Sequence, residues 1–292
     1  MSPSPPRWIA LLVLLLSGGG LRADLVTAER LYGEQRYAEA QPEFEAALAT
    51  DPTNRSALLH LGKLAAKRRD RAEAVRYLKQ AVELLPEDAE LQFEYGAACS
   101  FYADSLGTTL RAAIEARRGR IAMERAVELE PDNFMFRQGL IEFYTTAPRI
   151  VGGSMPKAYE QADAIAARDS DQGAFATANL KIVERDYRAA LDILAGVLRN
   201  EPDNYYALFQ FGRTSATSGL DLDAGRAALR RCLELPAPDK GAPPASVWWQ
   251  VSRIESRQGN LAAARQALVQ AQALAPNDSR IATALAEMPA GS

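Results

Sequence analysis

Histidine and cysteine are scarce in this sequence, and their scarcity excludes several kinds of chemistry. The single histidine is His60, so no cluster of histidines can hold a metal within one chain. The motifs His-Glu-x-x-His, Cys-x-x-Cys and Gly-x-Ser-x-Gly are all absent. We therefore expect no enzymatic activity, no catalytic residue, no metal site and no cofactor. Cys99 and Cys232 each lie in an apolar helical pattern, which favours unpaired core cysteines over a disulfide.

A strong excess of charge is also missing, since the net charge is −3 at pH 7. Nucleic-acid binders usually carry a large basic excess, so we expect no nucleic-acid partner. Residues 1–23 differ from the rest, with one arginine, then an apolar run from Trp8 to Leu16, then small residues that end at Ala23. This order predicts a cleaved secretory signal peptide and a periplasmic or secreted protein. The alternative is a membrane anchor formed by residues 8–22, which would be the protein's only attachment to a membrane.

Proline ends the same apolar pattern at several places along the chain. In the first copy, a small, a large and another small residue precede the proline at fixed offsets: Ala40, Phe44, Ala47 and Pro52. Such spacing marks one face of a helix, and the proline ends that helix. The pattern recurs 34 residues later and again twice near the C-terminus, as Ala74, Leu78, Ala81 and Pro86, as Ala190, Leu194, Val197 and Pro202, and as Ala264, Leu268, Ala271 and Pro276.

These residues resemble the tetratricopeptide repeat (TPR) over residues 24–288. The preceding helix of each pair also fits, with Leu58, Leu61 and Gly62 matched by Leu208, Phe211 and Gly212. The resemblance implies an all-α solenoid of about seven TPR helix pairs in a right-handed superhelix. The last segment, "NDSRIATALAEM", reads as a C-terminal capping helix, which repeat arrays need for solubility.

Three stretches interrupt the repeat period. An insertion at residues 101–118 carries most of a basic cluster of Arg111, Arg117, Arg118 and Arg120. We interpret this cluster as a solvated face with Glu115 and Glu124 as partners rather than an anion site. A glycine loop at 148–154 around Gly152, Gly153 and Ser154 is interpreted as a spacer rather than an anion site, with Ser154 capping the next helix. A proline-rich linker occupies residues 236–246.

The resemblance also implies which residues face the concave groove. The fifth and ninth positions of each first helix point to that side in this family, and aromatic and arginine side chains are typical interface anchors. Packing against neighbouring helices is the alternative role for the rings. The candidate binding residues are Phe93, Gln138, Glu142, Phe175, Asn179, Tyr206, Phe209, Arg213, Trp249, Arg253 and Arg257.

The predicted function is an exported scaffold or adaptor that binds a protein or an extended peptide in this groove. The carboxylate clamp of chaperone-binding relatives is not matched, because Ala66 stands where that clamp has asparagine. The alternative is a periplasmic carrier of a small ligand or a transport accessory protein, which would need an enclosed pocket of several hundred Å³.

Overall fold

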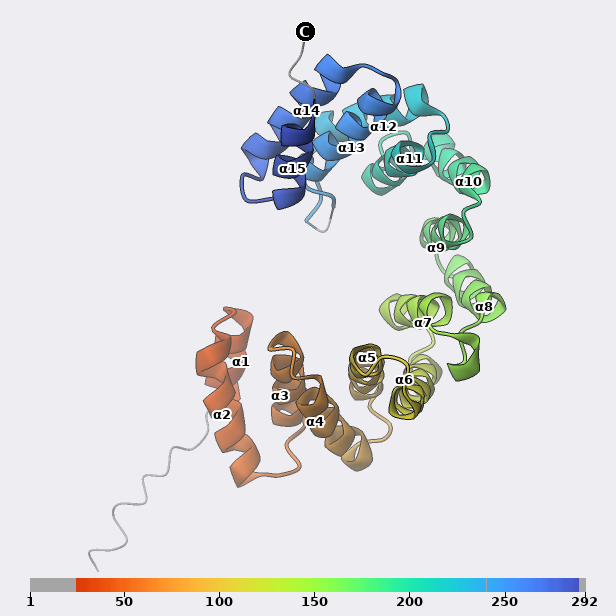
Figure 1. Cartoon of the computed structure of the whole chain (residues 1–292). Coiled ribbons are helices and arrows are strands. Elements are labelled where there is room, and N and C mark those ends of the chain that lie inside the picture. Colours follow the sequence, from red (N-terminus) through yellow and green to blue (C-terminus); the bar gives the residue numbers. More distant parts are fainter. Residues whose placement is uncertain (1–24, 240, 289–292) are drawn as a thin grey trace, which may run out of the picture. The chain divides into compact units, whose positions relative to one another are not determined.

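The computed structural model of the protein describes residues 25–239 and 241–288 (Figure 1). Within these residues the regular structure is entirely helical, with fifteen α-helices and one 3-10 turn. The predicted all-α solenoid of seven helix pairs with a capping helix is thus confirmed. The predicted signal peptide at residues 1–23 lies outside the described residues.

The chain divides into two compact units after Gly153. In unit 1, consecutive helices pack against one another as antiparallel pairs, and the 3-10 turn η2 packs against α6. Its elements are α1 (Leu25–Gly33), α2 (Tyr37–Thr50), α3 (Arg55–Lys67), α4 (Arg71–Leu84), α5 (Ala89–Ser105), α6 (Leu110–Leu129), α7 (Phe134–Thr146) and η2 (Arg149–Val151).

Unit 2 continues with the same construction from Ser154 onward. Here α11 packs against both α12 and α13, so that the first helices of two successive pairs are in contact. The elements are α8 (Met155–Ala166), α9 (Ser170–Val183), α10 (Tyr187–Asn200), α11 (Tyr205–Ser218), α12 (Leu222–Glu234), α13 (Pro244–Arg257), α14 (Leu261–Leu274) and α15 (Ser279–Glu287).

Short polar side chains begin most of these helices, which explains why the turns after the prolines are regular. The side-chain oxygen of Asn54 accepts a hydrogen bond from the backbone N–H of Ala57, and Asn204 does the same for Ala207. Such caps satisfy backbone donors that a helix start leaves free. The sequence therefore sets the start of most helices by a side-chain cap and the end of several by a following proline turn.

The small and large residues of the repeated pattern form the core. Ala40, Phe44, Ala190 and Leu194 are all fully buried. Alanine at these positions lets paired helices approach closely. Gly62 serves the same purpose, because an added Cβ would lie 2.6 Å from Leu78 Cγ. The predicted pattern of helix faces is confirmed by this burial.

The third helix pair is longer than the others, because α5 has 17 residues and α6 has 20. Arg118 and Arg120 of the predicted basic cluster form ion pairs with Glu115 and Glu124, at 2.9 and 2.6 Å. Both partners were expected from the sequence.

The glycine loop packs closely on its surroundings. A Cβ at Gly153 would lie 1.8 Å from the carbonyl oxygen of Ala147, and one at Gly152, whose φ is +110°, would lie 2.6 Å from Arg120 Cδ. Ser154 caps α8 by accepting from the N–H of Lys157, as predicted. The close approach of backbone to neighbours is a steric reason for both glycines.

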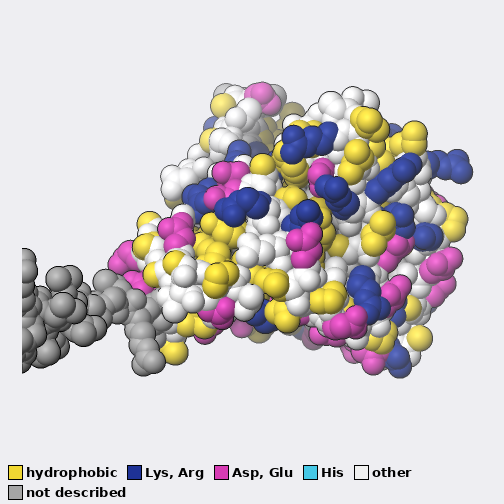
Figure 2. All heavy atoms as spheres, turned by 90° about the horizontal axis from the view of Figure 1, so that it is seen from below, with side chains coloured by type: hydrophobic (Ala, Val, Ile, Leu, Met, Phe, Trp, Pro, Cys, Tyr) yellow, Lys and Arg dark blue, Asp and Glu magenta, His cyan; other side chains and the backbone are white. Residues whose placement is uncertain are grey.

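Both cysteines are buried and unpaired, as predicted. Burial raises the pKa of each thiol to about 12. Among residues 25–239 and 241–288, none of the helices combines the length and apolarity that a membrane crossing requires. On the face that Figure 2 presents, acidic, basic and hydrophobic side chains are intermingled.

Candidate functional site

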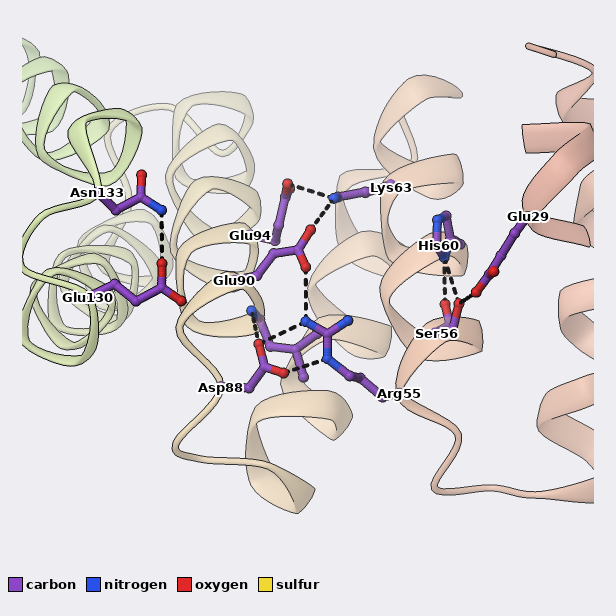
Figure 3. Close-up of polar contacts among 11 residues, drawn as sticks. Glu29, Arg55, Ser56, His60, Lys63, Asp88, Glu90, Glu94, Glu130 and Asn133 are labelled. Carbon is purple, nitrogen blue, oxygen red and sulfur yellow. Dashed lines mark hydrogen bonds and ion pairs between the residues drawn. The ribbon is translucent and has the colours of Figure 1, made fainter. Parts of the chain in front are cut away.

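In unit 1, the first helices of two successive pairs are joined by a network of opposite charges (Figure 3). Arg55 at the start of α3 binds both Asp88 and Glu90, with Arg55 Nη2 2.9 Å from Glu90 Oε2. Lys63, two turns further along α3, lies 2.9 Å from Glu90 and 3.1 Å from Glu94. We call these five residues the α3–α5 ladder. Its basic groups are fully matched by carboxylates within the unit.

The ladder shifts the acid–base properties of its members. Burial alone would raise the pKa of Asp88, but the guanidinium of Arg55 and the backbone N–H of Leu91 outweigh it and lower the pKa. Burial would also raise the pKa of Glu90, but the hydrogen bonds from Arg55 and Lys63 outweigh this effect and lower it. Burial would lower the pKa of Lys63, but Glu94 and Glu90 leave it raised. Every shift favours the charged forms, so the ladder is an ion-paired structure at neutral pH.

The single histidine belongs to the packing of the first two pairs. The ring of His60 stacks on Phe44, with centroids 4.6 Å apart, and meets the edge of Tyr32 at 4.7 Å. Its Nδ1 lies 2.8 Å from the carbonyl oxygen of Ser56. Burial lowers the pKa of His60, so the ring is neutral at pH 7.

Three candidate groove residues lie in unit 1. The ring of Phe93 stacks on Phe136 of α7 at 4.8 Å, and it covers Gly139, where a Cβ would lie 2.5 Å from the ring. Phe93 is therefore held by the following helix pair, which is the packing role left open by the sequence. Gln138 and Glu142 are exposed on α7.

The aromatic candidates of unit 2 are mostly half-buried. Phe175 of α9 and Phe209 of α11 pack at the margin of the large core cluster of this unit. Trp249 of α13 packs against Leu268 and its neighbours under the capping helix. Tyr206 keeps 43% of its surface exposed. Phe175, Phe209 and Trp249 thus each have one side on a core cluster, and Tyr206 is the most accessible of the four.

The polar candidates of unit 2 join α9, α11 and α13. Asn179 is exposed and accepts a hydrogen bond from Gln210 at 3.3 Å. Arg257 donates to the carbonyl oxygens of Ala216 and Thr217, at 2.8 and 2.9 Å. Arg253 donates to Gln250 at 2.9 Å. The bonds of Arg257 fix it against the C-terminal end of α11, whereas Arg253 bonds within α13 and reaches α11 only through Thr217 Oγ1, at 3.5 Å.

Arg213 differs from the other arginines of this face, because its side chain forms no hydrogen bond or ion pair with any residue in the described part of the chain. It is nevertheless half-buried, and burial lowers its pKa. Burial and the neighbouring charge of Arg257 also lower the pKa of Arg253. We call Arg213, Arg253 and Arg257 the α11–α13 arginines. Within the described residues, no carboxylate compensates any of the three.

Comparison with known proteins supports the repeat assignment. Tetratricopeptide repeat profiles match residues 31–93 and 245–278, one stretch in each unit. The protein is a tetratricopeptide repeat protein. A search of curated proteins found no match.

Solved structures of TPR proteins share the fold over most of their length. A tetratricopeptide repeat protein from Parabacteroides merdae is 13% identical, with 90% of this chain and 96% of that chain covered and a TM-score of 0.62. The C-terminal part of a TPR repeat-containing protein from Cytophaga hutchinsonii is 14% identical, with 90% and 99% covered and a TM-score of 0.52. At this identity the likeness concerns the fold.

Clefts between helices are lined by a mixture of charged, polar and apolar side chains. One of about 390 Å³ between α5 and α6 includes Arg118, Glu124 and Arg125, all of which take part in ion pairs or hydrogen bonds. Another of about 460 Å³ is lined by α12, α13 and α14 and includes Glu255, which is paired with Arg226. Neither cleft contains a candidate groove residue.

The sequence interpretation missed most of the α3–α5 ladder. Of its members, Lys63 stands at the ninth position of its helix, which the family resemblance directs toward the concave side. Arg55 lies 33 and 35 residues before Asp88 and Glu90, about one repeat away. Charges of opposite sign at corresponding places in successive repeats are the signal that could have revealed the ladder.

Proposed function

We propose that this TPR protein is an interaction scaffold that binds an acidic, extended protein segment on the face formed by α9, α11 and α13. The observation that supports this most directly is Arg213, a half-buried arginine without a partner in the described residues. A desolvated guanidinium without a carboxylate costs free energy, which a bound carboxylate would recover. Arg213 is therefore placed to receive an anionic group from outside the chain.

The surroundings of Arg213 suit an extended polypeptide. Phe209 lies one turn before Arg213 on α11, and Tyr206 precedes it on the same helix. Arg253 and Arg257 on α13 keep positive charge beside the end of α11. Apolar rings would bury side chains of the segment, while guanidinium groups would hold its carboxylates, in side chains or at a free C-terminus.

Binding of a labelled oligoglutamate peptide, followed by fluorescence anisotropy, tests this proposal. Arg213→Gln is expected to weaken binding by at least about tenfold, the effect of losing a central charged anchor. Arg188→Gln is the matched control, because Arg188 lies in the same unit and is paired with Asp221. Oligoglutamine should not bind. Equal binding by both variants, or none by the wild type, would reject the proposed face.

The natural partner can be sought in cells with a photo-crosslinking amino acid in place of Tyr206, the most exposed ring of the face. Crosslinked proteins should carry an acidic segment at the crosslinked site, and Arg213→Gln should reduce their yield.

Export of this scaffold is also a proposal, supported by the order of charged, apolar and small residues in 1–23. The mature protein should begin at or near Asp24 and lie outside the cytoplasm. N-terminal sequencing and cell fractionation would measure both, and an intact Met1 on cytoplasmic protein would contradict the proposal.

A further inference from the structure

The outer surface of α6 carries an apolar stripe that the proposed peptide binding does not use. Leu110, Ile114 and Ile121 fall on one side of the helix, at a rotation of 100° per residue. Their exposed fractions are 80%, 43% and 58%. Ile150 of the turn η2 is 77% exposed and lies beside them, because Arg117 of α6 donates to its carbonyl oxygen at 3.1 Å. We call these four aliphatic residues the α6 stripe.

The stripe exists because the third helix pair is lengthened. Leu110 and Ile114 lie in the first two turns of α6, whose 20 residues exceed the 13 or 14 of α4 and α12. The added turns of α6 pack on the lengthened α5 through Ala112 and Glu115, and their opposite side carries Leu110 and Ile114. Aliphatic side chains that remain exposed in such numbers on one helix side mark an interaction surface.

Three arginines near the stripe have no carboxylate partner in the described residues, whereas Glu124 and Glu128 beside Ile121 are paired with Arg120 and Arg125. Arg117 binds only a backbone carbonyl, and the guanidinium of Arg111 lies 5.2 Å from the ring centre of Tyr102. The side chain of Arg149 forms no hydrogen bond or ion pair with the described residues. By contrast, Arg118 and Arg120 of the same helix are paired with glutamates. The stripe is thus an apolar ridge flanked by three available arginines.

We propose that the α6 stripe docks the protein on an anionic lipid surface, with its aliphatic side chains in the interfacial layer and Arg111, Arg117 and Arg149 on lipid phosphates. Apolar side chains on one helix side with flanking arginines are the features of helices that lie in a membrane interface. Four side chains fall well short of the roughly 800 Å² per partner of a standard protein interface. A lipid surface needs no such complementary area, and the arginines give it charge complementarity.

A fluorescent label tests the contact at its site in the full-length chain. Both native cysteines are buried, so Ile121→Cys can be labelled with an environment-sensitive dye. Leu274→Cys is the control, because Leu274 is similarly exposed, at 56%, on α14. Vesicles of phosphatidylcholine with phosphatidylglycerol should shift the emission at position 121 to the blue, and pure phosphatidylcholine vesicles much less. Position 274 should not respond.

The arginines are tested by Arg117→Gln with Arg149→Gln, which should reduce the apparent affinity for the anionic vesicles several-fold. Arg199→Gln with Arg230→Gln removes the same charge from exposed positions on α10 and α12 and should change nothing. No shift at position 121, equal shifts at both positions, or an unaffected arginine variant would overturn the proposal. A lipid-independent shift that grows with protein concentration would instead show a second copy on the stripe, and would also overturn it.

Discussion

The first helices of successive pairs meet differently in the two units. In unit 1, α3 and α5 are joined by the ladder, in which Arg55 and Lys63 find Asp88, Glu90 and Glu94 within the same unit. In unit 2, α11 and α13 are joined through Arg257 and backbone carbonyls, and Arg213 has no partner in the described residues. With the same repeat geometry, basic side chains therefore form ion pairs between helices in unit 1, whereas in unit 2 Arg213 is left without an ion pair.

The cause lies in the acidic residues of the facing helices. Helix α5 carries Glu90 and Glu94, and Asp88 caps it. Helix α11 has no acidic residue at all, and the one carboxylate of α13, Glu255, is paired with Arg226 on the other side. A basic residue at this position stabilises the fold when a carboxylate of the facing helix pairs with it. When no carboxylate faces it, the same basic residue becomes a candidate binding residue.

Charge reversal at matched positions should give the largest effects. Lys63 and Arg213 both occupy the ninth position of a first helix. Arg213→Glu should abolish oligoglutamate binding, a loss of at least about 2 kcal/mol, because a central anchor becomes repulsive. It should change the free energy of unfolding by less than about 0.5 kcal/mol, since no ion pair is lost.

Lys63→Glu should do the opposite. It would place a third carboxylate beside Glu90 and Glu94, and should lower the free energy of unfolding by about 1–2 kcal/mol, as like charges replace a half-buried ion pair. Peptide binding should be retained. Urea unfolding and anisotropy on both variants measure the two effects, and similar behaviour of the two variants would remove the distinction between the units.

Acid should weaken the α3–α5 ladder of unit 1. The pKa values of Asp88 and Glu90 are lowered in the folded state, so their stabilisation is present above their ordinary values near 4 and is lost as pH falls through the lowered values. We expect a loss of about 1 kcal/mol, reduced by the partial exposure of both groups. Arg55→Ala should reduce the dependence of the free energy of unfolding on pH in this range. An unchanged dependence in that variant would contradict the role of the ladder.

A smaller loss is expected at the start of unit 2. Ser154→Ala removes the cap of α8 and should cost about 0.5 kcal/mol, the lower end for a lost cap, because the hydrogen bond to Lys157 is long at 3.4 Å. Thermal melting measures this loss of stability. Ser279→Ala is the control, because Asp278 and not Ser279 caps α15. Peptide binding should survive; its loss with unchanged melting would mean that the glycine loop belongs to a binding site.

The smallest expected signal is the reactivity of the two thiols, which can report the stability of each unit separately. Cys99 lies in unit 1 and Cys232 in unit 2, and burial raises the pKa of both thiols to about 12. Both should be almost unreactive toward thiol reagents until the surrounding helices open. Mass spectrometry of the labelled peptides should show faster labelling of Cys99 alone in Lys63→Glu, while equal acceleration at both would show that the units open together.

Much of the fold was predictable because helix pairing in a repeat is local. Ala190 and Leu194 mark a buried face, Pro202 ends the helix, and Asn204 caps the next one, all within fifteen residues of sequence. The partners of Arg118 and Arg120 were equally local, three and four residues away on α6. Such contacts follow from helical spacing, which a sequence displays directly.

The candidate site was predictable only as a set of positions. Phe93 and Phe209 occupy the same slot, yet the first is stacked on Phe136 and the second lies at the margin of a core beside Arg213. The hydrogen bond from Arg117 to the Ile150 carbonyl brings Ile150 beside the other residues of the α6 stripe. It joins two elements at positions 33 residues apart. These outcomes depend on which side chains meet across helices.

The sequence by itself determined the helices, their pairing and their buried faces, because each depends on spacing within a few turns and on caps beside them. Only the tertiary structure decided which charged groups are matched between different helices. Lys63 and Arg213 are alike in sequence terms, but the facing helix supplies two glutamates to one and none to the other. Whether a cation stabilises the fold or remains available for a partner depends on the opposing surface, which lies about one repeat away along the chain.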